Sequence, residues 1–208
     1  MKYLAIDTTT LEIKLAIYNT ENQETFQIIE HVGRKQSEKL HIKIKEILET
    51  NNLKVSDLNT IVVNLGPGSY TSLRLGIATA KGLALPFKHI NVVGVDSFKM
   101  MEELYAKQDT DAIMLENNAS QLYLQTNGQQ VIIAPEEVKD YLTEGQKVFG
   151  TGFEEYKEYL ENYNLQENTG KIEAIDLINY AIKHDLSDKP LEPLYIKPLT
   201  YKKYVYKL

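Results

Sequence analysis

Residues 64–84 read NLGPGSYTSLRLGIATAKGLA, and the fold of the chain is organised around them. The β-branched run Ile61-Val62-Val63 just before them predicts a short buried strand. Gly66-Pro67-Gly68 ends this strand, because proline fixes φ and glycine admits positive φ. Ser69 is the predicted N-cap of a helix that begins directly after it, so the stretch predicts a strand, a tight turn and a helix.

The predicted helix is rich in small residues. Its apolar positions at helical spacing are Leu73, Ile77, Ala80 and Ala84. A glycine inside a helix costs about 0.5–1 kcal/mol relative to alanine. Gly76 and Gly82 therefore predict close packing of other segments against this helix.

The composition is that of an ordinary globular protein. The chain has 208 residues, 43% of them hydrophobic, and a net charge of -6, so it should bind RNA poorly by itself. The absence of cysteine excludes disulfides, thiol nucleophiles and cysteine metal sites. The N-terminus reaches Asp7 after four apolar residues, so we expect neither a signal peptide nor a membrane span, and a cytoplasmic location.

The chain divides into two parts at the polar residues 108–110, which gives predicted half-domains over 1–107 and 108–208. In the first part, residues 3–30 predict a three-stranded meander. A helix capped by Ser37 should follow to about Thr50, with an apolar face formed by Leu40, Ile44, Ile47 and Leu48. A strand over 90–95 and a helix over 97–107 should complete this part.

The second part repeats the pattern in reduced form. Predicted strands cover 112–115, 121–126, 148–149 and 194–196, and predicted helices begin at Pro135 and cover 153–163 and 172–184. Asn127-Gly128 predicts a type I′ hairpin. The element order resembles the half-domain of actin-like, sugar-kinase and Hsp70-type ATPases. We therefore expect an α/β, ribonuclease H-like fold of two related half-domains.

Asp7-Thr8-Thr9-Thr10 lies in the predicted hairpin between the first two strands, where the ATPases that the chain resembles place a phosphate loop. A working site also needs a second acidic loop with glycine, and neither Asp111 nor Glu116 has a glycine beside it. One loop cannot neutralise a triphosphate. Our interpretation is a vestigial phosphate loop at Asp7, Thr8 and Thr9, with no cofactor bound firmly by this chain alone.

Other site motifs fail on their spacing. A P-loop or a dinucleotide fingerprint would need a further glycine where Thr71 stands, and Gly-x-Ser-x-Gly would need one at Pro67. We favour a structural turn at Gly66-Pro67-Gly68, with anion binding at the helix N-terminus as the alternative. No two of the four histidines lie within five residues, so we predict no metal site.

The turn and helix also resemble a known family. Gly66, Pro67, Gly68, Ser69, Thr71, Arg74 and Gly76 match the pattern of the bacterial tRNA threonylcarbamoyladenosine biosynthesis protein TsaB (YeaZ) family. Ser72 replaces a glycine of that pattern. Residues 34–40 resemble the family's Arg-x-His-Ser-Glu-x-Leu with Gln36 in place of the histidine, and residues 193–197 resemble its Pro-x-Tyr-Leu-Arg.

The resemblance implies a non-catalytic subunit, not an enzyme, that supports threonylcarbamoyl transfer to the adenosine beside the anticodon. Its implied partners are a TsaD-like catalytic subunit, a TsaE-like ATPase and a second copy when the chain is alone, with ATP and tRNA bound only through the complex. In the family, two helices of the first half pair with those of a partner subunit. The implied interface residues are Leu40, Ile42, Lys45, Arg74 and Lys81.

Three alternatives stay open. The chain could be an independent ATP-dependent small-molecule kinase of the same superfamily, or a peptidase that uses Ser69. The lysine- and tyrosine-rich residues 197–208 suit contact with RNA, although we favour a structural role for this end of the chain.

Overall fold

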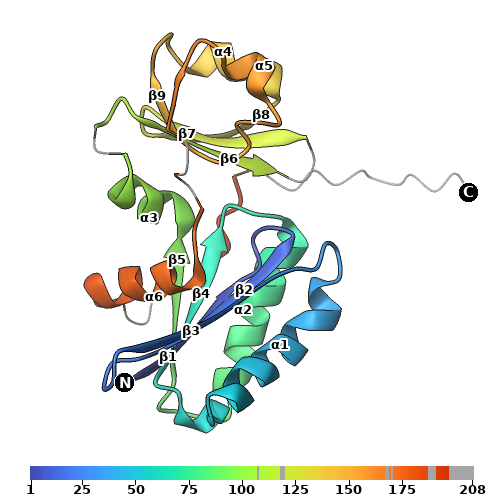
Figure 1. Ribbon diagram of the computed structural model, residues 1–208, viewed down its shortest axis with the longest axis vertical. Helices are drawn as coiled ribbons and strands as arrows, with labels where there is room; N and C mark the ends of the chain where they lie inside the picture. Colours follow the sequence, from blue (N-terminus) through green and yellow to red (C-terminus); the bar gives the residue numbers. More distant parts are fainter. Residues whose placement is uncertain (107, 118–119, 167–168, 170, 187–190, 197–208) are drawn as a thin grey trace, which may run out of the picture.

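A computed structural model describes residues 1–106, 108–117, 120–166, 169, 171–186 and 191–196 as two lobes, each built on a five-stranded sheet (Figure 1). The lysine- and tyrosine-rich residues 197–208 lie outside the described part. None of the helices in the described ranges is long and apolar enough to cross a membrane.

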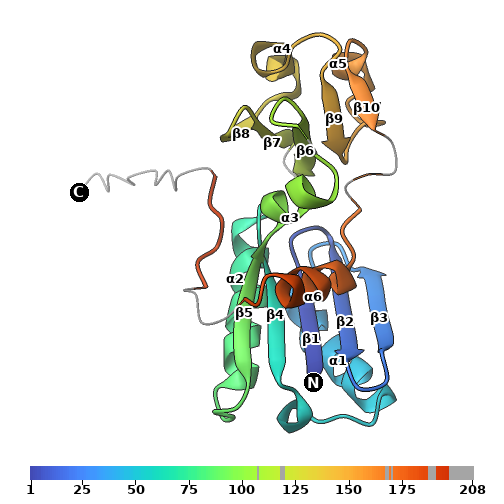
Figure 2. The ribbon, with the colours of Figure 1, turned by 90° about the vertical axis from the view of Figure 1, so that its left-hand side faces the viewer.

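The first sheet has the order β3-β2-β1-β4-β5 (Figure 2). Its strands are β1 (Lys2–Asp7), β2 (Glu12–Asn19), β3 (Glu24–His31), β4 (Thr60–Gly66) and β5 (Asn91–Asp96). β1 to β3 form an antiparallel meander, and β1, β4 and β5 are parallel. The predicted meander and the two later strands are confirmed.

Helices α1 (Gln36–Thr50) and α2 (Tyr70–Ala84) cover one face of this sheet, and the short 3-10 helix η1 (Val55–Asp57) follows α1. The predicted apolar face of α1 is confirmed, since Leu40, Ile44, Ile47 and Leu48 are all buried. The predicted cap at Ser37 is wrong, because α1 begins one residue earlier at Gln36, after Lys35. Ser69 caps α2 as predicted, with its Oγ accepting from the Ser72 N–H at 3.2 Å.

The opposite face of the first sheet is covered by α6 (Ala174–Lys183) near the C-terminus (Figure 2). This face carries the small side chains of Ala5, Ala16 and Val62, and Leu177 and Ile178 of α6 pack into the same buried cluster. The predicted half-domain over 108–208 is therefore wrong in its C-terminal part. Helical spacing shows which side of α6 is apolar but not which sheet lies beneath it.

The second sheet has the order β10-β9-β6-β7-β8. Its strands are β6 (Ala112–Asn117), β7 (Gln121–Thr126), β8 (Gln129–Ile133), β9 (Lys147–Gly150) and β10 (Asn164–Gln166). The covering helices are η2 (Pro135–Glu137), α4 (Val138–Tyr141) and α5 (Lys157–Leu160). Asn127 and Gly128 both have positive φ, 50° and 72°, as the predicted hairpin turn requires.

Two predictions for the second half are wrong. The helix expected over 153–163 is reduced to the single turn of α5. Residues 194–196 form no strand; they pack as an irregular segment against the first lobe.

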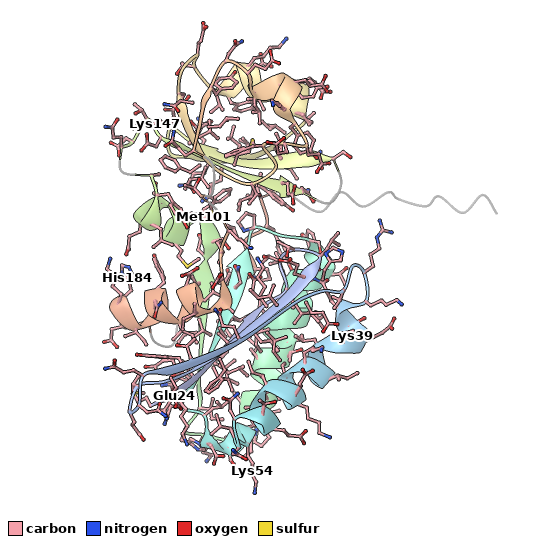
Figure 3. All side chains as sticks on the ribbon, in the orientation of Figure 1. Glu24, Lys39, Lys54, Met101, Lys147 and His184 are labelled. Atoms are coloured by element: carbon pink, nitrogen blue, oxygen red, sulfur yellow. The ribbon has the colours of Figure 1, made fainter. Side chains whose placement is uncertain are left out.

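The two lobes share apolar packing through α3 (Ser97–Leu104), which contacts β4 and β5 of one sheet and β6 of the other. Phe98 and Met101 of α3 belong to the same buried cluster as Ile113 and Tyr123 of the second lobe. Met101 lies at this junction, between the two sheets (Figure 3). The lobes are therefore joined by a continuous core beside the cleft between them.

Candidate functional site

A cleft of about 270 Å³ lies where the carboxyl end of the first sheet faces the second lobe. This edge is where open α/β sheets bind their ligands. Asp7, Thr9 and Thr10 of the predicted phosphate loop line it, together with Pro67, Ser69 and Ser97. The second lobe contributes Leu115, Glu116, Asn117, Tyr123 and Thr151. The structure thus brings the Asp7 loop and the glycine-proline turn together in one cleft.

Three hydrogen-bond donors of the Asp7 loop are already bonded within the protein. Asp7 is buried, and its Oδ1 accepts from the N–H of Thr9 at 2.8 Å and from Thr9 Oγ1 at 2.7 Å. Thr8 Oγ1 donates to the carbonyl oxygen of Ser72 at 2.7 Å. An incoming phosphate would have to displace these bonds.

The buried side chain of Gln36 holds the same loop from the α1 side. Its Nε2 donates to the carbonyl oxygens of Thr8, at 3.1 Å, and of Thr10. Its Oε1 accepts from Ser72 Oγ at 2.7 Å, and Ser72 Oγ accepts from Ser69 Oγ at 2.6 Å. The two departures from the family pattern, Gln36 and Ser72, are therefore hydrogen-bonded partners. From the sequence alone, Gln36 and Ser72 are considered separately. Because both positions differ from the family pattern in the same chain, their contact could have been predicted from the sequence.

The predicted turn packs tightly on the Asp7 loop. Gly66 has φ +108°, and a Cβ on Gly68 would lie 2.9 Å from the carbonyl oxygen of Thr9. The hydroxyl of Tyr123 donates to the carbonyl of Gly68 at 3.1 Å, from the other side of the cleft. The turn thus joins the two lobes, which supports the structural interpretation of this motif.

The two helix glycines differ. A Cβ on Gly76 would lie 2.8 Å from Thr8 Oγ1, so the predicted close packing is confirmed at this position. Gly82 is exposed, and a Cβ there would meet nothing within 4 Å. The same prediction is wrong for Gly82 within this chain.

Both acidic and basic side chains line the cleft. Lys14 is buried, and its Nζ donates to the carbonyl of Ile172 at 3.0 Å and lies 3.5 Å from a carboxylate oxygen of Glu12. Burial and the neighbouring Glu155 raise the pKa of Glu116 above its ordinary value. The cleft is lined by the carboxylates of Asp7, Glu12 and Glu116 and by two lysines, of which Lys14 is paired with Glu12 and Lys171 is exposed.

The next two features are the possible metal ligands and the hydroxyl of Ser69. Among the described residues, no three His, Asp or Glu side chains are grouped to hold a metal ion. The hydroxyl of Ser69 bonds to Ser72, and no histidine is among its hydrogen-bond partners in the described part of the chain.

The predicted interface residues separate into two groups. Ile42 is 59% exposed, and Lys45, Arg74 and Lys81 also lie on the surface of α1 and α2. Leu40 is fully buried, so its assignment to the interface is wrong. Leu40 lies on the inward stripe of α1 with Ile44, and a partner can reach only the outer side of the helix.

Comparison with known proteins gives the family. The model "TsaD: tRNA N6-adenosine threonylcarbamoyltransferase" matches residues 26–187. The tRNA threonylcarbamoyladenosine biosynthesis protein TsaB of Haemophilus influenzae is 23% identical, over 96% of this chain and 95% of that protein. The chain belongs to the TsaB/YeaZ family. TsaB of Escherichia coli is 31% identical over 103 residues, which span 50% of this chain and 43% of that relative.

Solved structures agree on the fold. YeaZ from Pseudomonas aeruginosa superposes with a TM-score of 0.66 at 19% identity, over 93% of this chain and 99% of that one. The ethanolamine utilization protein EutJ from Carboxydothermus hydrogenoformans gives 0.51 at 12% identity, over 85% and 89%. The predicted α/β fold is confirmed, and its two halves are related, because each sheet places an antiparallel three-stranded meander beside two parallel strands.

Proposed function

We propose that this chain takes part in the biosynthesis of threonylcarbamoyladenosine in tRNA, as a subunit that supports a TsaD-like catalytic subunit without catalysing the transfer. Family membership supports the pathway. The internal bonding of the Asp7 loop supports the non-catalytic role: Thr8 Oγ1, Thr9 Oγ1 and the N–H of Thr9 all have partners within the chain. These three donors would have to give up their bonds before they could bind a nucleotide.

The outer side of α1 and α2 is the proposed docking face. α1 contributes the exposed side chain of Ile42, and α2 contributes Arg74 and Lys81 with no acidic residue in its sequence. Apolar area surrounded by charge is typical of a protein interface. We propose that the catalytic subunit occupies this face in the complex and a second copy of the chain occupies it otherwise.

We propose that this chain meets the ATPase, its nucleotide and tRNA only as part of the complex. The TsaE-like ATPase supplies nucleotide binding, and because the chain has a net charge of -6, the other subunits supply most contacts with tRNA. The proposed location is the cytoplasm, where tRNA is modified.

Co-purification with the catalytic subunit, followed by a tRNA modification assay with this chain omitted and then restored, tests the proposal. We expect a stable complex and loss of modification on omission. Full modification without the chain would refute the function. Modification that needs the chain but occurs without a stable complex would refute the supporting role.

The kinase alternative is favoured by the cleft itself, which lies at the ligand-binding edge of the sheet. Calorimetry on the isolated chain with magnesium-ATP distinguishes it, because tight binding would favour a kinase and we expect none. Cleavage of a partner that disappears in Ser69→Ala would favour the peptidase.

A further inference from the structure

Tyr70, Arg74 and Tyr195 form a tyrosine–arginine cluster at the start of α2. The rings of Tyr70 and Tyr195 stack with centroids 4.0 Å apart and planes 10° from parallel. The Arg74 Cζ lies 5.0 Å from the Tyr70 centroid and 5.8 Å from the Tyr195 centroid. Arg74 Nε donates to the Tyr195 hydroxyl at 2.9 Å. The cluster therefore joins Tyr195 to two residues of α2 that lie 121 or more positions earlier in the sequence.

The segment that brings Tyr195 to α2 is itself held in place. The N–H of Leu194 donates to the carbonyl of Leu65, at the end of β4, at 2.8 Å. Leu194 and Ile196 pack against the buried cluster beneath α6, and Leu191 packs against the cluster beneath α1 and α2. The side chain of Tyr195 thus extends from an anchored backbone to the side chain of Arg74 on the surface of α2.

This anchoring has a consequence for docking. An arginine side chain is flexible, and a binding partner that must fix it loses affinity through the lost rotamer freedom. Here two rings and one hydrogen bond restrict the guanidinium before any partner arrives. Tyrosine and arginine are also the residue types that contribute most at the centres of interfaces.

We propose that Tyr195 is a positioning residue for docking: it holds the Arg74 guanidinium on the α2 face so that it can bind a carboxylate of the catalytic subunit. This inference rests on the proposed function, because it takes the α1–α2 face as the docking face. A carboxylate is the group that matches the planar donors of arginine. The second half of the chain thereby shapes an interface that lies on the first.

A double-mutant cycle on affinity for the catalytic subunit tests the inference, with Tyr195→Phe, Arg74→Ala and the double variant. Tyr195→Phe keeps the ring and removes the hydroxyl, so we expect affinity to fall about 3- to 10-fold, as for loss of one hydrogen bond, at unchanged thermal stability. Arg74→Ala should weaken binding further and reduce its salt dependence. The double variant should bind no more weakly than Arg74→Ala alone. Tyr159→Phe, on the exposed part of the second lobe, is the matched control.

Two outcomes would overturn the inference alone: unchanged affinity in Tyr195→Phe, or losses that add in the double variant. Failure of the unaltered chain to bind the catalytic subunit would instead refute the proposed docking. A second readout needs no partner: hydrogen exchange at the Arg74 Nε–H in the free chain should accelerate in Tyr195→Phe. Removal of residues 197–208 should leave affinity unchanged, because Leu191, Leu194 and Ile196 supply the anchoring contacts in the described part of the chain.

Discussion

Gly76 and Gly82 lie six positions apart on the same helix, and substitution by alanine should act on them with opposite signs. At either position the helix gains about 0.5–1 kcal/mol from the lower backbone entropy of the unfolded chain. At Gly82 nothing opposes this gain, because the added Cβ meets no atom within 4 Å. Gly82→Ala should therefore raise the free energy of unfolding by about 0.5–1 kcal/mol.

At Gly76 the added Cβ would lie 2.8 Å from Thr8 Oγ1 and 3.4 Å from a Val63 methyl. Thr8 Oγ1 cannot move away without losing its bond to the carbonyl of Ser72. Overpacking costs about 1–3 kcal/mol and the lost bond about 1 kcal/mol. After the helix gain is subtracted, Gly76→Ala should lower the free energy of unfolding by about 2 kcal/mol.

Urea denaturation gives the free energy of unfolding of both variants and of the unaltered chain, and thermal denaturation gives their melting temperatures, each followed by circular dichroism. For a protein of this size the melting temperature should fall by about 4–8 °C in Gly76→Ala and rise by about 2 °C in Gly82→Ala. A Gly76→Ala chain as stable as the original would refute the close approach of α2 to the Asp7 loop. A destabilised Gly82→Ala chain would refute the open surroundings of that position. A Gly82→Ala chain that is more stable but docks more weakly would support the proposed face.

Three further predictions concern the surface and the cleft. Ile42→Glu should weaken both self-association and pull-down of the catalytic subunit at unchanged stability. Unchanged behaviour in both measurements would remove Ile42 from the interface. The control is Lys54→Glu, because Lys54 follows the end of α1 and lies at the end of the first lobe that points away from the second (Figure 3). Removal of residues 201–208 should leave folding and tRNA association of the complex intact, whereas loss of association by an intact fold would assign this end to RNA contact. Because the folded chain raises the pKa of Glu116, the stabilising contribution of its protonated form is lost as pH rises through that pKa. Glu116→Gln should therefore be more stable than the original chain at pH 7, and the difference in denaturation midpoint should shrink toward about pH 4. A difference that stays constant with pH would contradict the raised pKa of Glu116 as its cause. The same pH-dependent change in the control variant Glu154→Gln would also contradict it.

Local patterns are sufficient for the strands of the first lobe and for the start of α2. The alternation in Glu12–Asn19, the β-branched run in β4 and the cap at Ser69 each depend on residues close in sequence. The same is true of the turn at Asn127-Gly128. Such features can be predicted because the interactions that decide them are short-range.

Errors arise where distant residues decide the outcome. α1 begins at Gln36 and not at Ser37, and the side chain of Gln36 bonds to Ser72 and to the Asp7 loop. Helical spacing likewise does not determine which surface α6 covers. Local pattern predicts Tyr195 within a strand, yet its main contacts are with Tyr70 and Arg74, more than 120 positions earlier.

The candidate site is only partly predictable. The sequence locates the Asp7 loop and the turn, and their meeting in one cleft is a consequence of the parallel pairing of β1 and β4. The internal bonds that occupy the loop depend on exact side-chain placement, which spacing does not supply. The assignment of Leu40 to the interface fails for a similar reason, since the direction of a residue on a helix is known only once its packing surface is known.

The return of α6 to the first sheet affects how the polypeptide can acquire its shape as it is synthesised. The small-residue face that includes Ala5, Ala16 and Val62 is among the first parts to leave the ribosome, while Leu177 and Ile178, which cover it, emerge only after the whole second sheet. The N-terminal lobe therefore cannot complete its core first, as separately folding domains do. Nascent chains stopped before residue 174 should expose this apolar face and bind chaperones through it. A fragment that ends at residue 107 should aggregate, even though it contains every strand of the first sheet.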